Sequence, residues 1–191
     1  MLFTVRSSEP PAIANHSLRS FFFAQLVAAR EGCLEDPAYD RELLYAATVL
    51  HDLGAGDLAE GKARFEVEGA DLAAGLLREH GVDEADVDLV WEAIALHTSA
   101  GIAERRGLLA YLTRAGVGVD FGGSVDVAAE WHEEIHAEYP RLGMARVLVD
   151  AIVERAAASP PYTLGAELLR ERQTNGITRI EQAAAAGAWG E

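Results

Sequence analysis

The chain has only one cysteine, Cys33, among its 191 residues, so it cannot form an internal disulfide. This predicts a protein of a reducing compartment, and we expect it to be cytoplasmic. The N-terminus lacks a basic region followed by a continuous apolar stretch, which is the pattern of a secretory signal. Half of the residues are hydrophobic, yet no apolar run approaches the roughly 18–20 residues that cross a bilayer. We therefore expect no membrane contact.

Basic residues are scarce as well: 16 lysines and arginines stand against 31 aspartates and glutamates, a formal net charge of −15. Phosphate recognition depends largely on Lys and Arg, so this balance argues against a nucleic-acid partner. It also argues against a polyanionic substrate, although Arg105-Arg106 could form a local basic patch. The expected substrate is a small neutral or weakly charged molecule. The oligomeric state stays open, and a homo-oligomer is compatible with the sequence.

Strand patterns are nearly absent, and apolar residues recur at helical spacing instead. The sequence predicts an all-α fold, a compact helical bundle that forms a single domain over 1–191. Its core is expected at about 13–158, and Ser159-Pro160-Pro161 separates this core from a short C-terminal helix and tail at 159–191. Helices are expected over 40–53, 68–80, 84–97, 105–115, 125–139, 141–158 and 164–173, with another that Asn15 caps and a ragged end from Gln182.

The dipeptide His51-Asp52 ends the apolar helical run 43–50. Neighbouring residues lie about 100° apart on a helix, so at least one of the two side chains sits at the margin of the apolar stripe. Placing both there costs desolvation unless something binds them. A divalent metal would compensate, because imidazole and carboxylate are both good ligands for such ions. The alternative is a neutral core histidine, with Asp52 capping the loop that follows.

Two distant residues extend this pair. His16 lies near the start of a helix whose apolar face must pack inside the protein. Asp120 lies in the apolar, glycine-rich stretch 115–123, where an unpaired carboxylate would be costly. Two nitrogens and two oxygens from His16, His51, Asp52 and Asp120 would leave one or two positions open on a metal, as a hydrolytic site requires.

This series in a helical chain resembles the HD-domain superfamily of metal-dependent hydrolases, and most closely its cyanamide hydratase-like branch. The resemblance covers about residues 13–125. The blocks that carry it are Asn15-His16-Ser17-Leu18-Arg19, the run from Ala47 to Gly54, the run from Arg64 to Ala70, the run from Trp91 to Ser99, and Gly116-Val117-Gly118-Val119-Asp120.

The resemblance implies an HD-type bundle that uses one divalent transition metal, with Zn²⁺ the first expectation and Fe²⁺, Mn²⁺ or Ni²⁺ also accepted. His16, His51, Asp52 and Asp120 would hold it and lower the pKa of a bound water, which would add to a cyanamide- or nitrile-like molecule. The protein would then be a hydratase, a lyase by reaction type. Two alternatives remain, an HD-type phosphohydrolase for a small phosphomonoester or nucleotide, and a non-catalytic binding or regulatory module.

Three further residues are candidates for catalysis. HD proteins with two metals often have a histidine where this chain has Glu66, so the resemblance implies one metal here. Glu66 is then the candidate general base, with Glu68 as its rival, because burial would raise a carboxylate pKa toward the working range. His97 and Thr98 would orient the substrate or protonate its developing nitrogen anion. The structural alternatives are carboxylates that favour a helix N-terminus and a hydrogen-bonded core histidine.

Other polar features have two interpretations each. The Gly-rich loop 55–64 follows the ligands and is a candidate lip of the site. Arg19 could reach the pocket or pair with an acidic neighbour. His132 and His136 have metal-ligand spacing but lie among glutamates, which favours a solvated acidic face. An apolar pocket would favour a cyanamide-sized ligand, whereas two or more Arg or Lys in it would favour phosphate.

Overall fold

The computed structural model describes residues 1–156 and 159–190. Within these ranges it contains α-helices and short 3-10 helices and no strand, so the all-α prediction is confirmed. No helix in the described part is both long and apolar enough to cross a bilayer. The α-helices are α1 (Leu2–Ser8), α2 (Pro11–Arg30), α3 (Arg41–Leu50), α4 (Phe65–Glu79), α5 (Glu84–Leu96), α6 (Leu108–Asp120), α7 (His132–Glu138), α8 (Met144–Arg155), α9 (Leu164–Asn175) and α10 (Arg179–Ala186).

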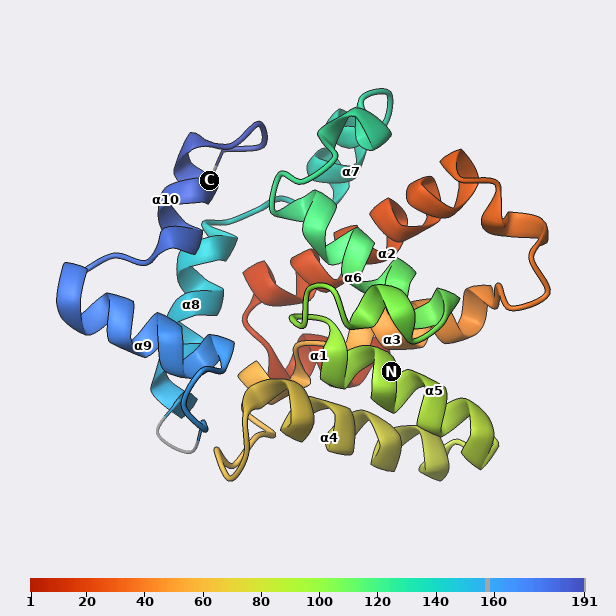
Figure 1. Ribbon diagram of the computed structural model, residues 1–191, viewed down its shortest axis with the longest axis horizontal. Coiled ribbons are helices and arrows are strands. Elements are labelled where there is room, and N and C mark those ends of the chain that lie inside the picture. The colour runs from red at the N-terminus through yellow and green to blue at the C-terminus, as the bar shows by residue number, and fades with distance from the viewer. Residues whose placement is uncertain (157–158, 191) are drawn as a thin grey trace.

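Helix α2 lies near the middle of the fold, where α6 packs against it (Figure 1). It begins at Pro11, whose fixed φ suits the first turn, and not at Asn15 as predicted. A Cβ atom on Gly116 would lie 2.2 Å from the Ser20 carbonyl oxygen, so only glycine permits this close crossing of α6 over α2. Helix α6 also runs on to Asp120, five residues beyond its predicted end at Ala115. The crossing therefore brings Asp120 beside the first half of α2.

Helix α3 ends at Leu50, and His51 and Asp52 lie directly after it, not within it as predicted. The chain then turns through a 3-10 helix, η2 (Leu53–Ala55), which packs against α4. A Cβ atom on Gly54 would lie 1.9 Å from the Phe65 carbonyl oxygen, so the backbones meet here with no room for a side chain. This contact fixes the turn that carries the His-Asp pair.

Helices α4 and α5 pack against each other along one edge of the molecule, and α8, α9 and α10 group on another side (Figure 1). The predicted helix 125–139 is instead a 3-10 turn, η4 (Val125–Ala128), followed by α7. The predicted helix 141–158 begins later, at Met144, and its last two residues lie outside the described ranges. Residues 182–186 of the predicted ragged end continue α10, which starts with a reciprocal capping box between Thr178 and Glu181.

Candidate metal centre

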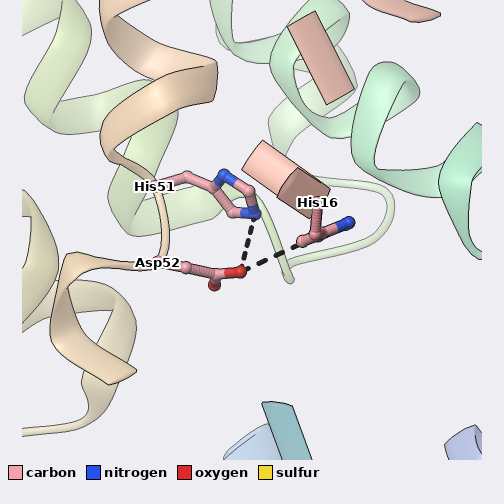
Figure 2. A group of neighbouring side chains, drawn as sticks. All are labelled: His16, His51 and Asp52. Atoms are coloured by element: carbon pink, nitrogen blue, oxygen red, sulfur yellow. Dashed lines mark ion pairs between the residues drawn. The ribbon is translucent and has the colours of Figure 1, made fainter. Parts of the chain in front are cut away.

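Three side chains from separate parts of the chain converge at one buried point. His16 comes from the second turn of α2, and His51 and Asp52 follow α3 (Figure 2). One nitrogen of each imidazole and one Asp52 oxygen all lie within 4.8 Å of one another. The Asp52 Oδ2 atom is 3.1 Å from His51 Nε2 and 3.7 Å from His16 Nε2, and these side chains are at most 1% exposed. The structure thus brings together three of the four predicted ligands.

The atoms that face this point have no hydrogen-bond partner among the described residues. His16 Nε2, His51 Nε2 and Asp52 Oδ2 are all buried and unpartnered. The opposite ring nitrogens are occupied: His51 Nδ1 donates to the Thr48 carbonyl at 2.7 Å, and His16 Nδ1 lies 2.5 Å from Asp120 Oδ2. With Nδ1 protonated, each Nε2 presents a lone pair. Two lone pairs and a carboxylate oxygen at one buried point favour a bound cation, and this donor set fits a divalent transition metal.

The electrostatics of the three side chains agree with that requirement. Burial lowers the pKa of His16 below its ordinary value, so its imidazole is neutral as a ligand must be. Burial also opposes charge on His51, but the Asp52 carboxylate and the Thr48 carbonyl raise its pKa above the ordinary value. Burial would raise the pKa of Asp52, yet His51 and His16 lower it strongly. The pocket therefore favours one positive charge beside Asp52, which a proton or a metal ion can supply.

Asp120 lies on the other side of the His16 ring and outside this group. Its two oxygens accept hydrogen bonds from Arg19 Nε and Nη2, both at 2.7 Å, and Oδ1 also accepts from Arg141 Nη1 at 3.1 Å. The sequence places Asp120 among the metal ligands, whereas these contacts place it behind His16. The physical reason is charge, because Asp120 and the Arg19 side chain are fully buried and neutralise each other. Arg19 thus pairs with an acidic neighbour, and sequence reasoning missed Arg141.

His97 and Thr98 also lie at the site, directly after α5. His97 Nδ1 donates to the Ile94 carbonyl at 2.7 Å, which turns Nε2 toward Asp52 Oδ1, 3.9 Å away. Burial, with a smaller contribution from His51, lowers the pKa of His97 to about 4, so this ring is neutral at pH 7. Thr98 Oγ1 donates to Glu66 Oε1 at 2.6 Å, which leaves its lone pairs to accept a further hydrogen bond.

Glu66 does not have the raised pKa expected of a general base. Burial alone would raise it, but hydrogen bonds from Arg64 and Thr98 outweigh burial and lower the pKa of Glu66. Arg64 approaches both carboxylate oxygens, at 2.7 and 3.1 Å. The rival base Glu68 is occupied too, since it accepts from the backbone amides of Glu60 and Gly61. The Glu66 carboxylate thus holds Arg64 and Thr98 in place, and the Glu68 carboxylate holds the backbone at Glu60 and Gly61.

A cavity of about 250 Å³ adjoins the three converging side chains. Arg114 is the single Lys or Arg among the described residues that line it, and its guanidinium binds Glu104 Oε1 and the His97 carbonyl. No residue of the loop 55–64 lines it, so the predicted lip is wrong. The cavity is lined by His16, His51, Asp52, Phe65, His97, Thr98, Arg114, Val117, Gly118, Phe121, Leu148, Val149, Ile152, Leu164 and Ile180.

The other histidine pair, His132 and His136, lies away from the three converging side chains. Their rings pack against Trp189 with centroids 5.0 and 5.4 Å away, so they do not form the freely solvated face that the sequence favours. His136 Nε2 lies 3.8 Å from Asp120 Oδ1. Trp189, which follows α10, thereby covers the outer side of the Asp120 network, an arrangement with no signal in the sequence.

Comparison with known families agrees with this geometry. The sequence model of the family described as HD domain matches residues 13–156, which include His16, His51, Asp52, Glu66, His97, Thr98 and Asp120. No curated protein matches the chain significantly.

Proposed function

The chain belongs to the HD-domain family, and we propose from this that it is a metal-dependent enzyme that adds water to a small uncharged molecule. HD domains are generally metal-dependent hydrolases, which sets the class of chemistry. Cyanamide and simple nitriles are the substrate types we propose. The observation that carries the proposal is the meeting of His16 Nε2, His51 Nε2 and Asp52 Oδ2, buried and without partners, at the floor of a cavity.

His16, His51 and Asp52 would hold one divalent ion, for which Zn²⁺ is our first choice and Fe²⁺, Mn²⁺ and Ni²⁺ also suit the donors. A bound ion supplies Lewis-acid chemistry, polarising a substrate and lowering the pKa of water. Three protein ligands would leave positions on the ion for a substrate and a water molecule, as catalytic sites require. Asp120 would act by holding His16 Nδ1, which fixes the ring so that Nε2 faces the ion.

The remaining polar groups suit proton handling and orientation. His97 presents Nε2 as an acceptor because its Nδ1 proton is committed to the Ile94 carbonyl. We propose that Nε2 takes up the proton released from water and returns it to the substrate nitrogen. Thr98, with its own proton committed to Glu66, would accept a hydrogen bond from the amino group of cyanamide or from the N–H of the amide that forms from a nitrile. Glu66 is then a positioning residue for Thr98.

The cavity lining favours an uncharged substrate over a phosphate ester. Phosphate sites provide several free cationic or N–H donors, whereas Arg114, the one Lys or Arg among the described lining residues, already binds Glu104 and the His97 carbonyl. The remaining wall is mostly apolar. Hydrolysis of a small phosphomonoester is the second candidate, supported by the family match alone. A purely regulatory module is disfavoured by the intact donor set.

The test is a paired assay on protein loaded separately with Zn²⁺, Fe²⁺, Mn²⁺ and Ni²⁺. Urea formation from cyanamide and amide formation from short nitriles are measured beside phosphate release from nucleoside monophosphates. We expect water addition to the uncharged substrates, lost in Asp52→Asn and kept in the exposed control Asp126→Asn. Phosphate release alone would overturn the substrate class but not the hydrolase. Inactivity on every substrate with each of the four metals would overturn the proposed function.

A further inference from the structure

Most of the cavity wall is apolar and lies beyond the polar floor. Leu148, Val149 and Ile152 contribute one helix face from α8, and Phe121 closes the end of α6. These residues belong to a buried apolar cluster that also includes Phe65. Polar groups are confined to the cluster of histidines, Asp52 and Thr98, with Arg114 at the edge. The site thus has one polar region for chemistry and an apolar region that the proposed chemistry does not use.

The cavity is larger than the smallest substrate of the proposed type. Cyanamide has three non-hydrogen atoms, whereas a cavity of about 250 Å³ has room for several water molecules. Water against an apolar wall is readily displaced by apolar groups, because their burial is favourable. A ligand that reaches from the floor to the α8 face would gain this contact, and one as small as cyanamide would not.

Two residues that complete the apolar wall lie outside the family match. Leu164 is the first residue of α9 and Ile180 the second residue of α10; both are half-buried and line the cavity. Arg172 of α9 holds this part of the fold in place. Its guanidinium binds Asp150 of α8 at 2.6 Å and Glu181 of α10 at 3.0 Å. The two helices therefore form a preformed wall.

We propose that the substrate carries an apolar substituent of a few carbon atoms, and that Leu164 and Ile180 select it. This inference rests on the proposed function for the reacting group, which would lie at the polar floor. The substituent lies between the α8 face and the α9–α10 wall. Substrate preference is then set by the C-terminal helices, while residues 13–156 supply the catalytic groups.

The experiment uses a homologous series of aliphatic nitriles, from acetonitrile to hexanenitrile, with the full-length metal-loaded protein. Burial of one methylene corresponds to about a fourfold gain, so kcat/KM should rise about fourfold per carbon before it levels off. Leu164→Ala and Ile180→Ala should flatten this rise. The matched control Ile177→Ala, at an exposed position between α9 and α10, should keep the wild-type slope. Thermal melting checks that each variant is folded.

A binding measurement separates this inference from the proposed function. The matching primary amides, from acetamide to hexanamide, are titrated while the methyl resonances of Leu164 and Ile180 are followed by NMR. Affinity that rises with chain length, with shifts at these methyls, supports the apolar subsite even if no nitrile is hydrated. Water addition or amide binding that is insensitive to chain length, or a wild-type slope in Ile180→Ala, would overturn the inference.

Discussion

Replacing Asp120 with asparagine should destabilise the protein severely, because it removes the negative charge with which two buried arginines pair. Asp120 and Arg19 are fully buried, and Arg141 is 6% exposed. Arg19 makes two hydrogen bonds of 2.7 Å to the carboxylate, and Arg141 adds one of 3.1 Å. Burial alone would raise the pKa of Asp120, but its interactions with Arg19, His136 and His16 hold it well below the ordinary value. The carboxylate is therefore charged in the folded protein at any ordinary pH.

The size of the effect follows from leaving Arg19 buried without a counter-ion. Removing one partner of a buried ion pair costs about 3–5 kcal/mol. For a protein of this length that corresponds to a decrease in Tm of about 6–20 °C. The matched control is Asp126→Asn, since Asp126 pairs with Arg30 at the surface, where both side chains are more than half exposed. That pair should contribute at most about 1 kcal/mol.

Urea unfolding followed by far-UV circular dichroism measures both variants, and metal content is measured on the same samples. Because Asp120 positions His16, Asp120→Asn should lower metal affinity by about 10–100-fold without removing the metal site. A decrease of less than about 1 kcal/mol in the free energy of unfolding of Asp120→Asn would refute the buried-charge argument. Complete loss of metal at saturating concentration, in folded protein, would make Asp120 a direct ligand after all.

Two further predictions concern the other carboxylates. Glu66→Gln should retain metal and lower turnover by less than about tenfold, because glutamine can still accept from Thr98; a fall of about 10²–10⁴-fold would make Glu66 the general base. Glu9 is buried, and its carboxylate has no hydrogen-bond partner among the described residues. Burial and then Asp52 raise the pKa of Glu9 well above the ordinary value, so the folded chain retains a proton that the unfolded chain releases. Stability from this group is full below the unfolded pKa and falls as pH rises toward the folded pKa. Glu9→Gln should remove that decline, so its free energy of unfolding in urea should exceed that of wild type by about 1–3 kcal/mol at pH 8 but not at pH 4. The same pH dependence of stability in both proteins would refute this prediction.

The converging ligands were accessible to sequence reasoning because their signal is local. His51-Asp52 ends an apolar helix, and His16 lies on a helix whose other side must be buried. The sequence also carries the pattern of the capping box that starts α10, Thr178 followed three residues later by Glu181, although no helix is predicted there. Local pattern thus predicts most of the helices and the floor of the site, but it misses α1 and α10 and joins η4 and α7 into one helix.

The parts that could not be predicted depend on long-range contacts. The sequence predicts Asp120 as a ligand because a buried carboxylate needs a partner, and nothing local shows that Arg19 and Arg141, 101 and 21 residues away, provide it. Glu66 was expected to have a raised pKa because burial was considered without Arg64 and Thr98. The apolar wall from Leu164 and Ile180 exists only once α9 and α10 pack against α8.

Metal stoichiometry tests the central claim, that His16, His51 and Asp52 form a single divalent metal site. Protein is stripped with a chelator, dialysed to equilibrium against excess Zn²⁺, and analysed by mass spectrometry for metal per chain. We predict about one ion per chain in wild type and none in Asp52→Ala, with unchanged helical circular dichroism, because the helices pack without needing the metal. Two ions per wild-type chain, or one ion retained in Asp52→Ala, would contradict the account.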